Sequence, residues 1–216
     1  MIVIVGAGLA GLTAARALEA AGYREYRVVE SSARVGGRVA TDSDEEFQYD
    51  VGFAVLNPAY PMIRRYLSLD ALELRYFDSG ALLLRGEGKR ELLVDPIAHP
   101  SRALEMLFRS FPSWGDRFRT LRLRYGNRPP ASPKDEGPST LETLRARGFT
   151  TAFVEEFFRP FFAGVFLDRE LEVSGELFAY LFDFFSRSQV ALPAGGMVGV
   201  AEALARPLPT ERLLVN

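Results

Sequence analysis

The stretch Ile2-Val3-Ile4-Val5-Gly6-Ala7-Gly8-Leu9-Ala10-Gly11 decides the fold of the chain. Residues 2–5 form a short apolar run, which is typical of a parallel strand buried on both faces. Three glycines spaced Gly-X-Gly-X-X-Gly come next, and small or apolar residues then recur at helical spacing up to Gly22, which we expect to cap the helix. A second apolar run at residues 26–29 ends in Glu30. This order predicts a Rossmann-like βαβ unit that binds a dinucleotide.

Each position of the loop has a physical task in such a unit. Gly6 makes the tight turn after the strand, and Gly8 lets the backbone approach a pyrophosphate closely. Gly11 lets the helix pack against the sheet, and the free N–H groups and dipole of the helix N-terminus attract the anion. Glu30 is placed to accept hydrogen bonds from both ribose hydroxyls, which disfavours a cofactor with a 2′-phosphate. A plain glycine-rich turn is the alternative.

The next segment distinguishes between cofactors. Residues 30–41 read Glu-Ser-Ser-Ala-Arg-Val-Gly-Gly-Arg-Val-Ala-Thr, which resembles the Glu-X3-Arg-X-Gly-Gly-Arg-X2-Thr signature of the flavin-containing amine oxidase superfamily. That superfamily also covers protoporphyrinogen oxidases and phytoene desaturase-like enzymes. The resemblance implies FAD, and Arg38 offers a charge-assisted donor to phosphate or ribityl oxygens. Ser32 departs from the arginine that many relatives carry there. A plain loop with solvated arginines is the alternative.

Two further segments resemble elements of the same family. Residues 49–53 resemble its Asp-X-Gly element, where Asp50 would brace the loop and Gly52 would let the backbone pass beside the cofactor. Residues 192–197 resemble its Pro-X-Gly-Gly-Met turn, which either approaches the flavin region or simply starts a helix. The residues that we expect to bind FAD are Gly6, Ala7, Gly8, Leu9, Ala10, Gly11, Glu30, Ser31, Arg34, Gly36, Gly37, Arg38 and Gly52.

The resemblance implies an α/β fold, a Rossmann-like FAD-binding domain with an inserted, largely helical α+β substrate domain. We assign residues 1–57 to the first part of the FAD-binding domain, 58–190 to the substrate domain with a Pro-rich linker at 127–138, and 191–216 to an incomplete return. Between these limits the residue pattern predicts helices at 58–69, 102–109 and 114–125, strands at 72–77, 81–85 and 91–94, and a capping box from Ser139 to Glu142. Residues 212–216 read as the start of another strand. Family members continue beyond such a strand, so we expect a truncated chain or one chain of a split protein.

Phenylalanines are concentrated between residues 149 and 185 at helical spacing, and Pro160 is expected to kink or end the first helix there. Three interpretations stay open: a lipophilic substrate cavity, a surface in peripheral contact with a membrane, and a Phe-rich helical core, which we favour.

Composition excludes several classes of site. The chain has no cysteine and a single histidine, His99, which excludes thiol chemistry and multi-histidine metal sites, so we expect no metal. The formal net charge of -2 gives no reason to expect a nucleic-acid partner. No stretch is long and apolar enough to span a bilayer, and the start does not read as a signal peptide, so we expect a cytoplasmic protein.

The resemblance implies an FAD-dependent oxidoreductase that moves a hydride from a small organic substrate to flavin N5. A lipophilic polyene or porphyrinogen fits the Phe-rich region slightly better than a small amine. No residue of the chain stands out as a general base, and the catalytic residues are unknown. Two alternatives remain: a flavin-dependent isomerase without net redox, and a non-catalytic FAD-binding fragment or subunit that needs a partner chain.

Overall fold

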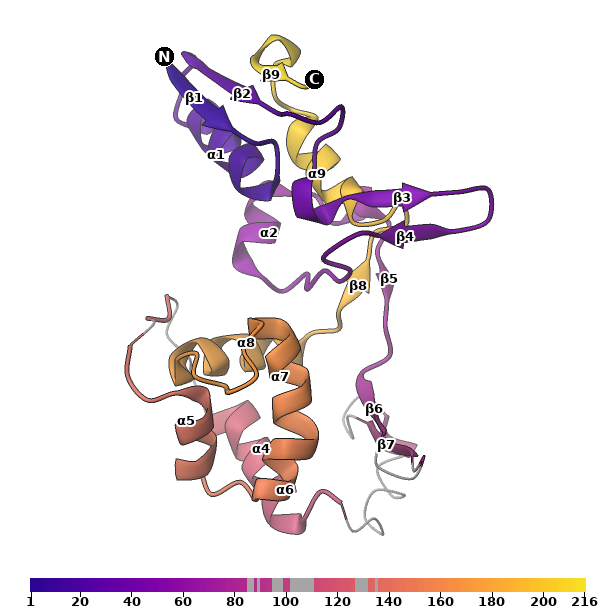
Figure 1. The fold of residues 1–216 in the computed structure, drawn as a ribbon, viewed down its shortest axis with the longest axis vertical. Coiled ribbons are helices and arrows are strands. Elements are labelled where there is room, and N and C mark those ends of the chain that lie inside the picture. The colour runs from indigo at the N-terminus through magenta and orange to yellow at the C-terminus, as the bar shows by residue number, and fades with distance from the viewer. Residues whose placement is uncertain (85–87, 89, 95–98, 102–110, 127–131, 135) are drawn as a thin grey trace. The chain divides into compact units, whose positions relative to one another are not determined.

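A computed structural model describes the chain except at residues 85–87, 89, 95–98, 102–110, 127–131 and 135 (Figure 1). The chain divides into two compact units. Unit 1 comprises Met1–Phe77 and Ser188–Asn216, and unit 2 comprises Asp78–Arg187. All thirteen residues that we expect to bind FAD lie in unit 1, which also contains residues 58–77 of the segment that we assigned to the substrate domain.

Unit 1 is built on a parallel sheet. Its strands β1 (Ile2–Val5), β2 (Tyr26–Val29) and β9 (Leu213–Leu214) lie in the order β1-β2-β9, and helix α1 (Leu9–Ala20) connects the first two (Figure 1). Val5 lies opposite Val29, and Val29 lies opposite Leu214. The strand expected at 212–216 is therefore present and pairs in parallel with β2. Because β1 and β2 end level with each other, the loops that follow them leave the same edge of the sheet.

The expectation that the first strand is buried on both faces is wrong. Val3 is 52% exposed and Val5 is 85% exposed, and only Ile4 packs against the core of unit 1. The reason is that β1 is an outer strand of the sheet as far as the described residues form it. An apolar run predicts a strand, but its burial depends on the elements that cover it.

The core of unit 1 lies between the sheet and its helices. Leu12 and Ala15 of α1 and Val28 of β2 are buried together with Val200 and Leu204 of helix α9 (Val198–Ala205). The other elements of unit 1 are the 3-10 turns η1 (Gly37–Val39), η2 (Asp70–Leu72) and η5 (Thr210–Arg212), strands β3 (Thr41–Ser43), β4 (Gln48–Asp50), β5 (Arg75–Tyr76) and β8 (Ala191–Leu192), and helix α2 (Pro61–Tyr66). The strand expected at 72–77 is thus shortened to β5, which pairs antiparallel with β8.

Unit 2 is largely helical. Its elements are strands β6 (Gly80–Leu84) and β7 (Arg90–Val94) and helices α4 (Trp114–Gly126), α5 (Thr140–Ala146), α6 (Thr151–Phe153), α7 (Arg159–Phe166) and α8 (Gly175–Arg187). The two strands form an antiparallel hairpin. The capping box is confirmed, because Ser139 and Glu142 each accept a hydrogen bond from the other's backbone N–H. The helix expected at 102–109 and half of the linker expected at 127–138 lie outside the described residues.

Pro160 neither ends nor interrupts the helical path through unit 2. A π-helical turn (Val154–Phe158) joins α6 to α7, and Pro160 occupies the first turn of α7. A proline is tolerated there because its missing N–H has no obligatory helical acceptor, and the wider π turn precedes it. Pro160 therefore does not end the helical path, and a kink at this position stays a prediction.

The phenylalanine repeat forms the core of unit 2. Phe158 is fully buried, and its ring lies 5.0 Å from that of Phe149, 5.1 Å from Phe153 and 5.9 Å from Phe178. The buried members of the repeat are Phe149, Phe153, Phe158, Phe162, Phe178 and Phe182. Edge-to-face packing of this kind is typical of an aromatic core, which is the interpretation that we favoured. Among the described residues, no helix is long and apolar enough to cross a bilayer.

Candidate cofactor site

The first glycine loop is shaped by contacts within the chain itself. Gly6 has φ +96°, a left-handed conformation that favours glycine. A Cβ on Gly11 would lie 2.0 Å from the carbonyl oxygen of Gly6, so no larger residue fits at position 11. Gly8 is different, because a Cβ there would meet only the carbonyl oxygen of Gly36, at an ordinary 3.8 Å. Contacts within the described part of the chain therefore leave room for a Cβ at position 8.

The second glycine loop lies directly against the first. Gly8 and Gly36 form an isolated parallel bridge, and the N–H of Gly36 donates to the carbonyl of Ala7 at 2.9 Å. Gly37 has φ +56°, and a Cβ there would lie in ordinary van der Waals contact with the Cα of Gly8, at 3.5 Å. Two motifs almost thirty residues apart thus form one continuous backbone surface at the carboxyl edge of the sheet.

Glu30 is held rigidly at the same edge. Its Oε2 accepts the N–H of Ala7 at 2.8 Å, and its Oε1 accepts the N–H of Ser32 at 2.9 Å. The hydroxyls of Ser31 and Ser32 lie 3.3 Å and 3.0 Å from Oε1. These donors, the Ala7 N–H foremost, lower the pKa of Glu30 to about 2, so the carboxylate is charged at neutral pH. The N–H of Ala7 is consequently engaged by Glu30.

The N-terminus of α1 supplies uncapped donors. Gly8 is the N-cap, the N–H of Leu12 is the first to donate within the helix, and no side chain caps the first turn. The N–H groups of Leu9, Ala10 and Gly11 therefore have no helical acceptor. The turn itself contains no acidic residue, so the Glu30 carboxylate on the N–H of Ala7 is the negative charge held beside the positive end of the helix dipole.

The two arginines of the signature have different surroundings. Arg34 donates to Asp42 Oδ1 at 2.6 Å and to the carbonyl of Thr41 at 3.2 Å, which ties it to β3. Arg38 is exposed, and no hydrogen bond or ion pair engages its guanidinium among the described residues. Of the two, Arg38 is the one free to meet an anion.

A hydrogen-bond cluster that sequence reasoning missed lies behind these loops. Asp50 Oδ1 accepts the Thr41 hydroxyl at 2.6 Å and the N–H of Met197 at 2.8 Å. The Thr41 hydroxyl oxygen also accepts the N–H of Val198 at 3.0 Å, so Asp50 and Thr41 together cap α9. Asp50 is therefore a brace, as expected, but its partner segment lies 147 residues away. The sequence marks Thr41 as the last residue of the signature, but it gives no sign of the contact with residues 197–198.

Close packing explains two further glycine positions, Gly52 and Gly196. A Cβ on Gly196 would lie 2.4 Å from Thr41 Cγ2, and a Cβ on Gly52 would lie 2.3 Å from the carbonyl oxygen of Arg38. Each glycine thus permits one segment of the chain to approach another. Direct contact of Gly52 with a cofactor stays a prediction.

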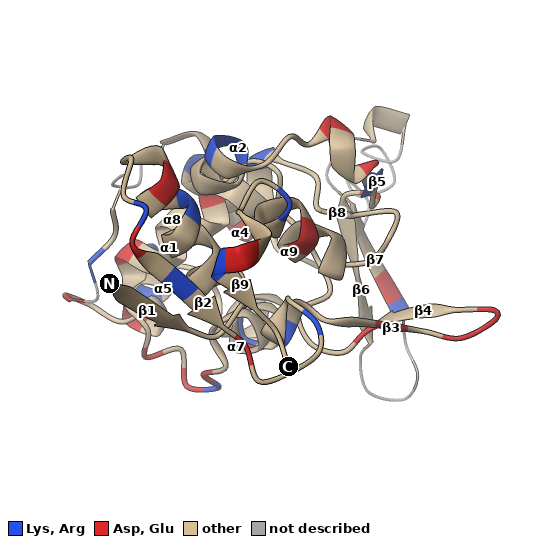
Figure 2. Cartoon of the chain, turned by 90° about the horizontal axis from the view of Figure 1, so that it is seen from above, with Lys and Arg blue, Asp and Glu red and all other residues tan. Residues whose placement is uncertain are grey.

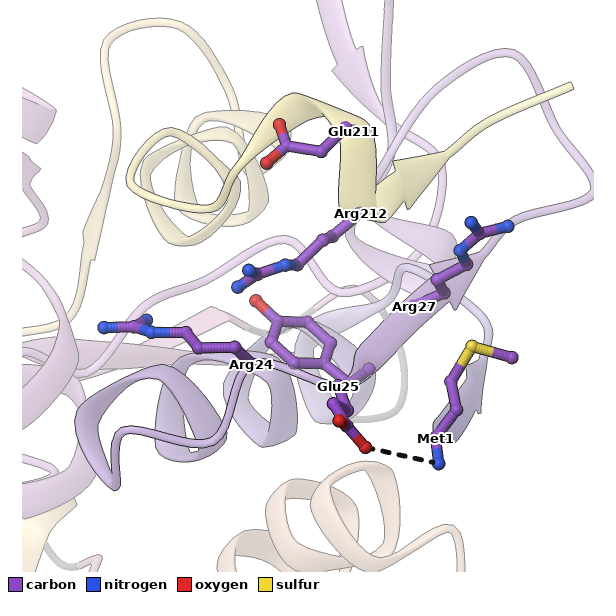
Figure 3. A pocket seen from close by; sticks show the side chains of 7 residues that line it. Met1, Arg24, Glu25, Arg27, Glu211 and Arg212 are labelled. Carbon is purple, nitrogen blue, oxygen red and sulfur yellow. Dashed lines mark ion pairs between the residues drawn. The ribbon is translucent and has the colours of Figure 1, made fainter.

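A shallow hollow lies at the opposite edge of the sheet, where the three parallel strands begin (Figure 3). The Met1 amino group lies 4.0 Å from Glu25 there. Nearby, Glu19 pairs with both Arg24 and Arg212 and accepts the Tyr26 hydroxyl, which ties α1 to η5 and β2. None of the thirteen expected cofactor residues lines this hollow. In the described part of the chain no group of three His, Asp or Glu side chains is arranged to hold a metal ion.

Charged residues are scattered over both units (Figure 2), and the tip of the β3–β4 hairpin is acidic. The model of the family described as flavin containing amine oxidoreductase matches residues 9–216. The chain belongs to this family. Its cofactor is FAD, as expected from residues 30–41, and the α/β fold is confirmed.

Individual proteins are similar to this chain in sequence or in fold. An L-amino-acid oxidase of Sistrurus catenatus edwardsii is 42% identical over 76 residues, which is 35% of this chain and 14% of that protein. Putrescine oxidase, solved as the wild type bound to putrescine, matches all of this chain and 50% of its own with a TM-score of 0.64 at 22% identity. An oxidoreductase from Methanosarcina mazei matches likewise, with a TM-score of 0.66 at 21% identity. The chain thus spans about half the length of these solved structures.

Proposed function

We propose that unit 1 binds the ADP portion of FAD at the carboxyl edge of its sheet. The backbone bridge between Gly8 and Gly36 carries this proposal, because it brings both glycine loops to the free N-terminus of α1. The N–H groups at the start of α1 bind the pyrophosphate, where close approach requires that Gly8 has no side chain. Arg38 and Gly37 contact the inner half of the cofactor.

Glu30 is proposed to bind the ribose of the adenosine. Its carboxylate is charged and oriented by the N–H groups of Ala7 and Ser32. Both serine hydroxyls lie at Oε1, and Oε2 accepts the Ala7 N–H. One ribose hydroxyl can therefore donate to Oε2, and another can replace the serine hydroxyls at Oε1. A 2′-phosphate would meet this carboxylate with like charge, which favours FAD over a phosphorylated dinucleotide.

The whole protein is proposed to be a flavin oxidoreductase. When bound, the flavin supplies the redox chemistry by accepting a hydride from an organic substrate at N5. Membership of an oxidoreductase family supports this activity and does not favour the isomerase alternative. The residues described here orient the cofactor and hold its negative charge. Because the chain spans half of the solved structures, a subunit that needs a second chain for activity remains the second candidate.

The substrate is proposed to be a small organic amine or amino acid. Relatives named L-amino-acid oxidase and putrescine oxidase support this class. A lipophilic substrate, such as a polyene or porphyrinogen, was suggested by the phenylalanine repeat. That suggestion weakens because most of those rings are packed against each other in the core of unit 2.

The test is FAD binding by the variant Gly8→Ala, measured by isothermal titration calorimetry. The chain itself accommodates this Cβ, so stability should be unchanged, whereas FAD affinity should fall by about tenfold or more because the pyrophosphate cannot approach. Gly164→Ala in α7 is the matched control, since a Cβ there meets no atom within 4 Å. Equal FAD affinity of Gly8→Ala and wild type would contradict the proposed site. A wild-type chain that binds no FAD would favour the subunit that needs a partner.

A further inference from the structure

The hydroxyl of Ser32 has two acceptors within reach. Its Oγ lies 3.0 Å from Glu30 Oε1 and 2.7 Å from the carbonyl oxygen of Arg34. A hydroxyl carries one proton, so a full hydrogen bond is made to one of these acceptors at a time. The Arg34 carbonyl is the closer of the two. Ser32 can therefore withdraw its proton from Glu30 and still donate a hydrogen bond.

The oxygen of Ser32 has unused capacity as an acceptor. A hydroxyl oxygen has two acceptor lone pairs, and no group in the described part of the chain donates to Ser32 Oγ. Glu30 Oε2, by comparison, already accepts the N–H of Ala7 at 2.8 Å. Ser32 is also exposed, so a ligand can reach its side chain. Ser32 Oγ is thus a vacant acceptor beside the carboxylate that we assign to the ribose.

The backbone on both sides of this hydroxyl is held in place. The N–H of Glu30 donates to the carbonyl of Leu214 at 2.8 Å. The N–H of Asn216 donates to the carbonyl of Ser32 at 3.1 Å, and the N–H of Ser32 donates to Glu30 Oε1 at 2.9 Å. Oε1 and Ser32 Oγ are consequently presented together, at a fixed spacing, by one short segment after β2.

We propose that Ser32 is a ribose-binding residue of the cofactor site, an inference that rests on the proposed binding of FAD by unit 1. One hydroxyl of the adenosine ribose donates to Glu30 Oε1, and Ser32 then donates to the Arg34 carbonyl. The second ribose hydroxyl has two acceptors open to it, Glu30 Oε2 and Ser32 Oγ, and the serine oxygen is the one that receives no other hydrogen bond. Three hydroxyl protons thus meet three acceptors.

This role was not visible in the sequence. Ser32 occupies a variable position of the signature at 30–41 and is not one of the thirteen residues that we expect to bind FAD. The structure adds it because its hydroxyl lies between the ribose carboxylate and a backbone carbonyl. Recognition of two vicinal hydroxyls by Glu30 and Ser32 together would make the site selective for an intact ribose.

Calorimetry with three nucleotides tests this role, because the ligands differ only in the ribose. ADP, 2′-deoxy-ADP and 3′-deoxy-ADP are titrated into the 216-residue wild-type chain and into Ser32→Ala. The variant should bind ADP about fivefold more weakly, as expected for the loss of one neutral hydrogen bond. One of the deoxy nucleotides lacks the hydroxyl that Ser32 accepts. For that ligand the variant and the wild type should bind equally, whereas a merely structural role would weaken all three ligands alike.

Two further variants serve as controls. Ser32→Thr keeps the hydroxyl and should bind ADP within about twofold of the wild type. Ser68→Ala is the matched control, because Ser68 is another exposed serine of unit 1 and lies outside the expected cofactor residues. It should bind all three nucleotides as the wild type does. Circular dichroism checks that each variant is folded.

Three results would overturn the proposal. The first is an ADP affinity of Ser32→Ala equal to that of the wild type, and the second is equal weakening for all three nucleotides. The third needs no variant: equal affinity of the wild-type chain for ADP and both deoxy nucleotides. A wild-type chain that binds neither FAD nor ADP would refute the FAD site itself, and this proposal with it, so the two failures are distinguishable.

Discussion

Replacing Asp50 by alanine tests whether the cluster behind the glycine loops holds unit 1 together. The change removes the acceptor of the Thr41 hydroxyl and of the Met197 N–H, and Met197 is 1% exposed, so its N–H loses a partner in a buried environment. Hydrogen bonds to a charged group contribute about 1.5–3 kcal/mol each, and the two share one oxygen, so we expect a loss of about 3 kcal/mol. For a chain of 216 residues this lowers Tm by about 10 °C.

The assay is thermal unfolding followed by circular dichroism, with Asp44→Ala as the matched control. Asp44 also accepts several hydrogen bonds, from Glu46, Phe47 and Tyr49, but all are local to the exposed hairpin tip. Its loss should lower Tm by less than about 3 °C. Adding Thr41→Val to Asp50→Ala should cost little more, because both changes break the same cluster. A Tm of Asp50→Ala within 3 °C of wild type would refute the reasoning.

The other predictions concern the loop, the ribose acid and the core. Gly11→Ala should prevent the βαβ unit from folding, since its Cβ would lie 2.0 Å from the carbonyl oxygen of Gly6; a native circular dichroism spectrum would contradict this. The pKa of Glu30 is lowered from 4.5 to about 2, so the stability it contributes is present above pH 4.5 and is lost as the pH falls towards 2. The Tm difference between wild type and Glu30→Gln should therefore shrink over that range, and a constant difference would count against it. Phe158→Ala should lower the free energy of unfolding in urea by about 4 kcal/mol, and Phe161→Ala, at a position 41% exposed, by much less. Similar losses at both positions would argue against a packed core.

The elements that were predicted best are those whose constraints are local. The glycine at position 11 is required by a carbonyl five residues earlier, and the capping box at Ser139 is complete within four residues. The parallel pairing of 2–5 with 26–29 follows equally from one strand–helix–strand unit. Such features can be predicted from the sequence because all the residues that determine them lie within one short segment.

Features that depend on distant or covering segments were missed. The contact of Asp50 with Met197 joins segments 147 residues apart, and neither residue type indicates the other. The exposure of β1 depends on which strands flank it, and the engagement of Arg34 by Asp42 depends on the course of β3. The exposure of Trp114 and Phe118 on α4 could not be predicted, because apolar residues four positions apart fit a buried helix face equally well.

The central claim is that this chain holds the ADP portion of FAD, and competition binding tests it most directly. FAD is titrated into the wild-type chain by calorimetry, first alone and then with saturating ADP or saturating FMN. The account predicts that ADP displaces FAD and that FMN does not, because Gly8, the start of α1 and Glu30 bind the pyrophosphate and the adenosine ribose. Displacement by FMN without displacement by ADP would contradict it.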